Sequence, residues 1–442
     1  MLPRPFMYGR QGMASIRITN KKALDLKPAP GFILCYSGCP NPTTKAGGER
    51  ANSVKKASLT LMVFTLMNFV LSMAAFVFNG ILDKVAVSLS VSIADSGLLN
   101  TMYAYGAAFG VPVILIVLRK IERIRMLKIM LLITVLMTLA LVFAQSFGLM
   151  LIIRLVMGVC ANSYGVLAIA TVVSLSSKER LGRSMALLIA GNSLALVFGI
   201  PLTRALASIL DWRGIFWILN VIMIFSLIYF KINLPDGDHE STKLDIKNEL
   251  KYLKDGKALL VILYSFIMFV GYGAFYTYVT PYLLFLFPSL EAAMSVILVL
   301  LGIASFTGNA IGGHASDRIG YAKSLLLGAA LQMALMLLIL VFQPVMWLCV
   351  LFVILWLWST WFTGLQLNTG IAQETQNKSS FMLSMNNSAI QLGSAIGSSL
   401  AAVVISLGGI QNIIFIALAA SMGITWIQWI SNRKKTQVLD ME

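Results

Sequence analysis

Residues 308–323 read GNAIGGHASDRIGYAK, and this stretch decides how the rest of the chain is interpreted. An apolar run ends in small residues, and an acid, a base and a glycine follow at Asp317, Arg318 and Gly320. A similar passage from glycines into a basic loop occurs about 200 residues earlier, at 106–128. Two copies of one feature at this separation predict two similar halves of a membrane protein.

The composition places the chain in a lipid bilayer. It is 58% hydrophobic and 12% charged, with a mean hydropathy of +0.84, far more apolar than an ordinary soluble domain. Charged residues divide it into ten uncharged runs, 57–82, 96–118, 129–153, 155–177, 184–203, 214–230, 258–290, 292–316, 324–373 and 379–432. The last two are about twice as long as a bilayer-crossing helix, and they break naturally at Gln343-Pro344 and Gly408-Gly409.

Ten runs, two of them split, predict twelve spans, and only helices satisfy every backbone group in lipid. The expected fold is therefore an all-α membrane protein with twelve transmembrane helices in two pseudo-symmetric six-helix bundles. The expected parts are a basic, disordered cytoplasmic tail (1–58), a first bundle (59–230), a cytoplasmic linker (231–257), a second bundle (258–431) and a cytoplasmic tail (432–442). A sequence offset of 198 relates Arg119 to Asp317 and Gly199 to Gly397.

The net charge of +16 raises the question of nucleic-acid binding, but the placement of the basic residues argues against it. With both termini in the cytoplasm, the internal cytoplasmic loops carry seventeen Lys and Arg residues and the outer loops carry three. Basic residues near span ends resist translocation, so this imbalance predicts a multi-pass protein of the cell membrane with cytoplasmic termini.

Several motifs resemble those of one transporter family, the major facilitator superfamily, over residues 59–431. The segment Gly313 to Gly320 matches its loop signature G-x-x-x-D-R-x-G, and residues 149–158 around Arg154 resemble its fourth-span motif. The segment from Gly191 to Pro201 is similar to a fifth-span glycine-proline motif of the twelve-span drug:proton antiporter branch, which includes sugar-efflux-like permeases. The resemblance implies a secondary transporter that works by alternating access between two bundles.

The resemblance also implies conformational switch loops and helix-packing positions. The switch residues are Gly110, Arg119, Glu122 and Arg123 in the first half, and Gly313, Asp317, Arg318 and Gly320 in the second. In the first-half loop Arg119 stands where the family has aspartate, and Glu122 where it has glycine. A tight turn without a switching role is the alternative for these loops. The expected packing residues are Gly191, Gly199, Pro201, Gly393 and Gly397.

Arg154 is the costliest residue to place in lipid, at about 2.5–3.5 kcal/mol for an arginine in mid-span. One interpretation is a cation that faces a substrate cavity. The other is a snorkelling side chain that reaches the outer headgroups.

The resemblance implies that the first, fourth, seventh and tenth spans line the cavity. Apart from Arg154, the chemistry of these spans is aromatic and uncharged. The predicted cavity residues are Asn68, Asn79, Arg154, Asn162, Tyr164, Tyr272, Phe275, Tyr276, Trp358, Trp361, Gln366 and Asn368. Such a lining suits sugars, nucleosides, neutral amphiphiles or lipophilic cations. Packing between helices is the alternative role for each residue.

The leading hypothesis is a secondary active exporter of a small organic solute (drug, sugar or nucleoside-like), coupled to protons by antiport and working as a monomer. Proton coupling rests on the resemblance, because none of the eighteen Asp and Glu residues falls in the middle of a predicted span. An importer or uniporter is the first alternative, and a non-transporting membrane receptor is a distant one. With two histidines and no nucleophile–base or metal-ligand spacing, we expect no enzyme activity, no cofactor and no metal site.

Overall fold

The computed structural model describes residues 44–117, 121–176, 181–234, 256–375 and 380–439. The chain divides into two compact units, Met1–Asn52 and Ser53–Glu442, and the account below concerns the second. The predicted tail 1–58 and linker 231–257 fall mostly outside the described residues. The domain boundaries therefore remain predictions.

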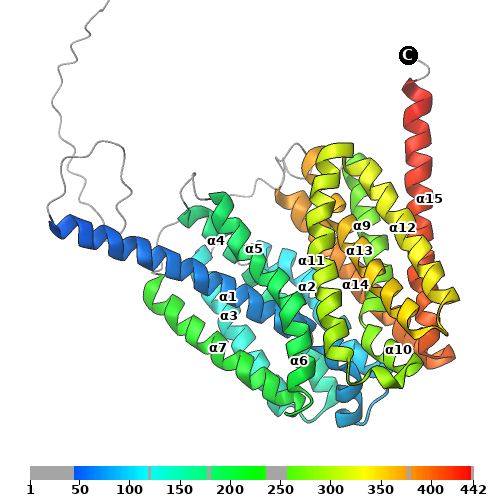
Figure 1. The fold of residues 1–442 in the computed structure, drawn as a ribbon. Helices are drawn as coiled ribbons and strands as arrows, with labels where there is room; N and C mark the ends of the chain where they lie inside the picture. The colour runs from blue at the N-terminus through cyan, green and yellow to red at the C-terminus, as the bar shows by residue number, and fades with distance from the viewer. Residues whose placement is uncertain (1–43, 118–120, 177–180, 235–255, 376–379, 440–442) are drawn as a thin grey trace, which may run out of the picture. The chain divides into compact units, whose positions relative to one another are not determined.

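The first bundle is built from the helices before residue 234 (Figure 1). They are α1 (Thr44–Leu89), α2 (Ile93–Val117), α3 (Arg123–Phe143), α4 (Phe147–Leu175), α5 (Leu181–Leu194), the π-helix η1 (Ala195–Gly199), α6 (Ile200–Leu206) and α7 (Trp212–Asn233). Two irregularities interrupt it. The backbone of α1 kinks at Ile81 (φ −134°, ψ 19°), and α5, η1 and α6 form one span of 26 residues, Leu181–Leu206, with a π-helical segment inside it.

The second bundle begins at residue 256 (Figure 1). It contains α9 (Gly256–Tyr276), α10 (Val279–Leu286), the short helix η3 (Pro288–Leu290), α11 (Met294–Ile319), α12 (Tyr321–Val341), α13 (Met346–Glu374), α14 (Ser380–Gly408), the short helix η4 (Ile410–Asn412) and α15 (Ile413–Leu439). The predicted seventh span is thus broken between α9 and α10. The sequence did not predict that break.

The predicted twelve-span architecture is confirmed. In the described part of the chain, eleven helices are long and apolar enough to cross a membrane, and α2 lies at the position of the second predicted span. The two longest uncharged runs divide where expected, between Val341 and Met346 and between Gly408 and Ile413. Local hydropathy and the Pro and Gly residues in these connections are enough to set those breaks.

Glycine contacts reveal the internal repeat more directly than the loop motifs do. A Cβ atom on Gly106 would lie 2.0 Å from the carbonyl oxygen of Leu155, and one on Gly308 would lie 2.3 Å from that of Trp358. These close approaches join α2 to α4 and α11 to α13. Because Gly106 and Gly308 are 202 residues apart, the register of the helices differs from the predicted offset of 198.

The loops account for that difference. Five residues separate α2 from α3, whereas Gly320 alone separates α11 from α12. The helices therefore repeat at one spacing and the connections at another, and an offset taken from the loop motif misaligns the helices by about one turn.

Helices α2 and α11 each pack against the opposing bundle. Helix α2 packs against α14, and α11 packs against η1 and α6 and only slightly against α5. We call the end of the bundles that carries Arg123, Arg183 and Arg318 the basic end, and the opposite end, which carries Lys84 and Glu291, the outer end. The packing of α11 against η1 and α6 therefore lies in the outer half of the fifth span.

Candidate functional site: the faces between the two bundles

Arg154 is enclosed in the first bundle. Its side chain is fully buried, and its three nitrogens donate to backbone carbonyls of α1 and α2: Nε to Leu99 (3.0 Å), Nη1 to Ala74 (2.9 Å) and Nη2 to Ala75 (3.0 Å). Hydrogen bonds to a charged group contribute about 1.5–3 kcal/mol each. They offset the cost of a buried cation, and they hold the guanidinium away from the headgroups that a snorkelling arginine would reach.

Two aromatic rings complete the environment of this cation. The guanidinium carbon of Arg154 lies 4.9 Å from the ring centroid of Phe78 and 4.5 Å from that of Tyr103. The hydroxyl of Tyr103 accepts a long hydrogen bond from Asn162 Nδ2 (3.4 Å). Asn162 is half-buried, so Tyr103 links the enclosed cation to a partly accessible amide.

Three predicted cavity residues pack inside their own bundle. Tyr164 is fully buried, with its ring centroid 6.5 Å from that of Phe230. Gln366 is also fully buried and donates to the backbone of α11 (2.8 Å). Trp358 is half-buried and stacks on Phe362 (5.4 Å between centroids, 20° between planes).

Two polar residues of α1, Asn68 and Ser72, face α5. Asn68 Nδ2 donates to the carbonyl of Leu188 (3.0 Å), and one turn later Ser72 Oγ donates to Asn192 Oδ1 (2.7 Å). Gly191 permits this approach, because a Cβ atom there would lie 2.4 Å from a carbonyl oxygen of α1. Asn68 is buried, whereas Ser72 is half-buried and Asn192 is exposed.

Asn79 lies where the bundles meet. Its Oδ1 accepts from Asn100 Nδ2 (2.5 Å), and its backbone carbonyl accepts from Thr280 Oγ1 of α10 (2.8 Å). Asn79 stands two residues before the kink of α1 at Ile81. This predicted cavity residue thus contributes to the contact between the bundles through its backbone.

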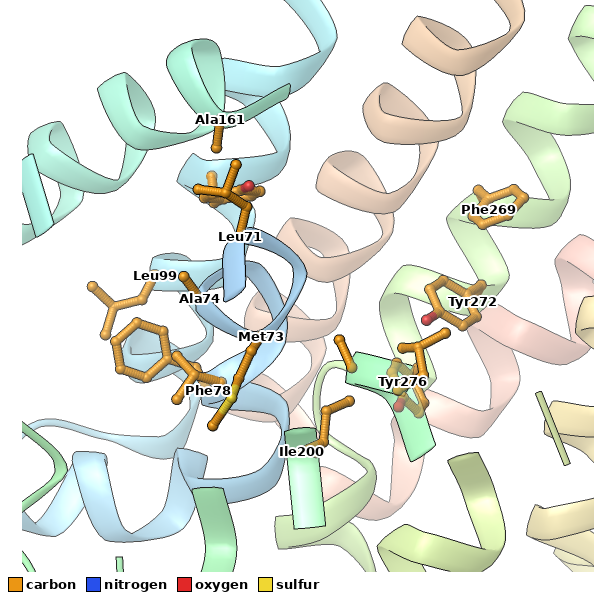
Figure 2. Close-up of a cluster of buried hydrophobic side chains, with 14 of the residues drawn as sticks. Leu71, Met73, Ala74, Phe78, Leu99, Ala161, Ile200, Phe269, Tyr272 and Tyr276 are labelled. Atoms are coloured by element: carbon orange, nitrogen blue, oxygen red, sulfur yellow. The ribbon is translucent and has the colours of Figure 1, made fainter. Parts of the chain in front are cut away.

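The second bundle presents an aromatic cluster between α9 and α13. The ring of Tyr272 stacks on that of Tyr276 (4.9 Å, 21°) and lies 6.3 Å from Trp361 in an edge-on arrangement. Phe275 packs edge-on against Trp356 (4.9 Å). Figure 2 shows Tyr272 and Tyr276 projecting from the same side of α9.

Two hydrogen-bond donors in this cluster lack partners. The hydroxyl of Tyr272 and the indole N–H of Trp361 are buried and have no hydrogen bond within the part of the chain that the structure describes. Leaving such groups unpaired costs about 1–3 kcal/mol each. A bound solute with acceptor oxygens would remove that cost.

Asn368 is exposed near the end of α13. Its Oδ1 accepts from Asn386 Nδ2 (3.0 Å), and Asn386 Oδ1 accepts in turn from Ser265 Oγ (2.6 Å). This chain of polar groups connects α13, α14 and α9.

An ionic cluster ties the bundles together at the outer end. Arg204, 2% exposed in α6, donates to Asp83 Oδ1 of α1 (2.5 Å) and to Glu291 Oε2 of the second bundle (2.5 Å). It also donates to the carbonyl of Gly80 (3.2 Å) beside the kink. Lys84 Nζ lies 3.9 Å from Glu291 Oε1. Arg204 therefore connects the kink of α1 to the opposing bundle.

The same faces are covered at the outer end and exposed towards the basic end. On α2, Tyr105 contacts Ser399 of α14 (3.3 Å between hydroxyl oxygens), while Phe109, one turn nearer the basic end, is 59% exposed. On the fifth span, Arg204 is 2% exposed, whereas Ile189 is 51% exposed. The structure is thus closed at its outer end.

The predicted switch residues lie at the basic end. Arg119 is outside the described residues. Glu122 precedes the first residue of α3, and Arg123 Nη1 donates to the carbonyl of Ala170 in α4 (3.3 Å). A Cβ atom on Gly110 would lie 2.4 Å from Val159, so Gly110 is a packing position as well.

In the second half, Gly313 to Ile319 belong to the last turns of α11, and Gly320 forms the connection to α12. Gly320 has φ +81°, a conformation that residues with a side chain rarely adopt. Asp317 and Arg318 therefore lie on a helix that ends abruptly at a glycine.

The predicted packing glycines differ in what they approach. A Cβ atom on Gly393 would lie 2.3 Å from the carbonyl oxygen of Phe266, and one on Gly397 would lie 1.9 Å from that of Val270. Gly199 instead faces the side chain of Met73 (3.3 Å). Pro201 lines an apolar groove of about 430 Å³ between α11 and the segment formed by η1 and α6. The other lining residues are Phe198, Leu202, Ala205, Ser295, Val296 and Val299.

Sequence reasoning did not select Ser72, Asn192, Arg204 or Glu291 as site residues. Asn192 lies in the segment from Gly191 to Pro201, whose similarity to the fifth-span motif depends on its glycines and proline. Arg204 and Glu291 lie at the ends of uncharged runs, where a charge by itself indicates only a boundary of a span. Their partners lie between 87 and 121 residues away, so no local pattern indicates the pairing.

Two helical bundles that meet at one end and are built from helices of membrane-crossing length are typical of a polytopic membrane transporter. Residues 64–375 match the model of the Major Facilitator Superfamily. The chain belongs to this superfamily. Its matched relatives are transporters and not enzymes, in agreement with the expectation of no enzyme activity.

Two relatives agree with this assignment. The chain is 26% identical over 370 residues to an uncharacterized MFS-type transporter of Bacillus subtilis (strain 168), covering 83% of this chain and 91% of the relative. It is 26% identical over 395 residues to a probable sugar efflux transporter of Helicobacter pylori (strain P12), covering 86% and 98%.

The fold is similar to that of a mutant of the nucleoside transporter NupG, with a TM-score of 0.67, 11% identity and coverage of 85% and 99%. It is also similar to a bacterial homolog of the human lysosomal transporter Spinster, with a TM-score of 0.60, 14% identity and coverage of 85% and 94%.

Proposed function

We propose that the protein exports a small organic solute (drug, sugar or nucleoside-like) across the cell membrane by alternating access, in exchange for protons. The observation that carries this proposal is the change of exposure along α2 and the fifth span. One face is covered by the opposing bundle in its outer half and exposed in its basic half. A rocking motion of the two bundles exchanges which half is covered.

Orientation follows from the basic residues. We propose that the basic end, the linker 231–257 and both termini lie in the cytoplasm of a cell whose plasma membrane contains the protein, because basic loops resist translocation. The structure then corresponds to a state open to the cytoplasm, the state in which an exporter loads its solute.

We assign Arg154 a positioning role. Its three carbonyl bonds join α4 to α1 and α2, and Tyr103 connects it to Asn162. The solute itself would contact the accessible polar groups and the aromatic cluster of Tyr272, Tyr276 and Trp361, whose unpaired donors favour a ligand with acceptor oxygens. The other predicted lining residues would pack against these solute-contacting groups and hold them in place.

The switch loops would set the balance between the two states. Asp317 lies in the last turn of α11, and Arg318 follows it at the cytoplasmic rim. When the basic end closes, we expect Asp317 to accept hydrogen bonds from the opposing bundle, at a basic residue or a helix N-terminus. Breaking them favours the state seen here.

Proton coupling requires a group that binds and releases protons, and the available carboxylates lie near the span ends. Among the described residues, every Asp and Glu lies near a helix end or in a connection. Asp83 and Asp95 are the candidates we propose for proton binding, since both stand close to the outer end, where protons enter during export.

Reconstitution of the purified protein in liposomes tests the proposal. A pH gradient imposed across the vesicle should drive flux of a radiolabelled hexose or nucleoside against its own gradient, and collapsing the gradient with an uncoupler should abolish that accumulation. Flux that ignores the gradient would support a uniporter, and accumulation in the same direction as the protons would support an importer.

A further inference from the structure

Ser72 of α1 and Asn192 of the fifth span form a hydrogen-bonded pair apart from the aromatic cluster. Asn192 lies eleven residues from the first residue of that span, Leu181–Leu206, which corresponds to about 16 Å along a helix. Its side chain is exposed. An amide exposed to hydrocarbon at that depth would be costly, so the direction in which it points decides its role.

The helical register turns Asn192 towards the opposing bundle. Arg204 follows twelve residues later, and three α-helical turns take about eleven residues, to which the π-helix η1 adds one. Asn192 and Arg204 therefore share a face. Arg204 binds Glu291 of the second bundle on that face (2.5 Å), whereas Asn192, nearer the basic end, is uncovered. Leu194 is 43% exposed and, two residues after Asn192, lies on another side of the helix.

The local contacts define which atoms Asn192 offers. Its Oδ1 accepts from Ser72 Oγ (2.7 Å), and its Nδ2 has no hydrogen-bond partner among the residues that the structure describes. Gly191 holds the backbone of α5 against α1, since a Cβ atom there would lie 2.4 Å from Thr65 O. Asn192 is thus pre-positioned with its carbonyl engaged and its two N–H donors free.

The charges nearby exclude ionic recognition on this face. The guanidinium of Arg154 is fully buried against carbonyls, and no Asp or Glu among the described residues stands in mid-span. A cationic solute would find no counter-charge in mid-span, and an anionic solute would find no accessible cation there. A neutral solute with hydroxyl or carbonyl oxygens matches the donors of Asn192, Tyr272 and Trp361.

We propose that Ser72 and Asn192 form a hydrogen-bonding subsite on the first bundle for a neutral, hydroxyl-bearing solute. The subsite determines specificity for sugars or nucleosides over lipophilic cations. It rests on the proposed transport function and deepens it. Asn192 donates to the solute, and Ser72 holds the amide in the donating orientation.

Kinetics in proteoliposomes test the subsite. The probes are a radiolabelled hexose, a radiolabelled nucleoside and tetraphenylphosphonium. Asn192→Leu removes the amide at similar volume and should raise the half-saturating concentration of the transported hydroxylated probe about tenfold, the effect of one hydrogen bond lost from binding. Ser72→Ala should raise the half-saturating concentration less, because this substitution leaves the amide of Asn192 in place and only frees it to rotate.

Asn220→Leu is the matched control. Asn220 is fully buried in α7, and its amide has no hydrogen-bond partner in the described part of the chain. The same chemical change there should leave the half-saturating concentration within twofold of the wild type. An equal effect of both substitutions would overturn the subsite, because it would report a general disturbance.

Water access supplies a readout that needs no substrate. In a variant with its native cysteines replaced, Asn192→Cys should react with a membrane-impermeant maleimide applied from the basic side, and Leu194→Cys should not. Absence of labelling at position 192 would refute the subsite. If the wild type carries tetraphenylphosphonium but neither hydroxylated probe, the transport function stands and the proposed substrate class falls. If it carries no probe, the class also falls.

Discussion

Weakening the ionic cluster at the outer end should open that end. The substitution is Glu291→Gln, which keeps the shape of the side chain and removes the charge that faces Arg204. The Arg204 side chain is 3% exposed and that of Glu291 is 54% exposed, with 2.5 Å between Nη2 and Oε2. The pair is therefore intermediate between a surface ion pair and a buried one.

The magnitude follows from that geometry. Exposed ion pairs contribute about 0.2–1 kcal/mol, and breaking a buried pair costs about 3–5 kcal/mol. A half-exposed carboxylate on a buried guanidinium, replaced by an amide that still accepts one hydrogen bond, should lose about 1–2 kcal/mol. That loss changes the ratio of outer-closed to outer-open molecules about 5- to 30-fold.

Distance measurements by double electron–electron resonance can detect this shift. Spin labels at Val87 and Leu407, 81% and 83% exposed at the outer ends of the two bundles, should report a larger long-distance population in Glu291→Gln. Asp211→Asn is the control, because Asp211 also lies at the outer end and pairs with Arg213 of its own bundle. An unchanged distance distribution in Glu291→Gln, or an equal change in the control, would show that the ionic cluster does not hold the outer end closed.

Three further predictions concern the helices around the site. Tyr272→Phe should leave the unfolding temperature of the solute-free protein unchanged or raise it, because it removes an unpaired buried hydroxyl, yet weaken solute binding several-fold by titration; a lower unfolding temperature would show that the hydroxyl has a partner. Gly106→Ala should destabilise the protein by about 1–3 kcal/mol in thermal unfolding, since its Cβ would lie 2.0 Å from a carbonyl oxygen, while Gly165→Ala, with nothing within 4 Å, should not. Arg154→Lys keeps the charge but cannot reach three carbonyls, so unfolding should require about 2–4 kcal/mol less; wild-type stability would contradict the cage.

The sequence by itself determined the number of spans, their approximate ends and the division into two halves. Uncharged runs of bilayer length, broken at Gln343-Pro344 and Gly408-Gly409, are local features, and in lipid a local run has one solution, a helix. The loop at Gly313 to Gly320 likewise identified the family, because its motif lies within eight consecutive residues.

Only the tertiary structure decided which groups each polar residue contacts. Whether Arg154 snorkels, faces a cavity or is caged depends on which carbonyls α1 and α2 turn towards it. Whether Asn192 faces lipid or the opposing bundle depends on a π-helical residue that changes the register of the span. The pairing of Arg204 with Glu291 depends on two bundles meeting. Helix rotation and contacts between distant segments set these outcomes. A hydropathy pattern shows where each span lies but indicates neither its rotation nor its partners.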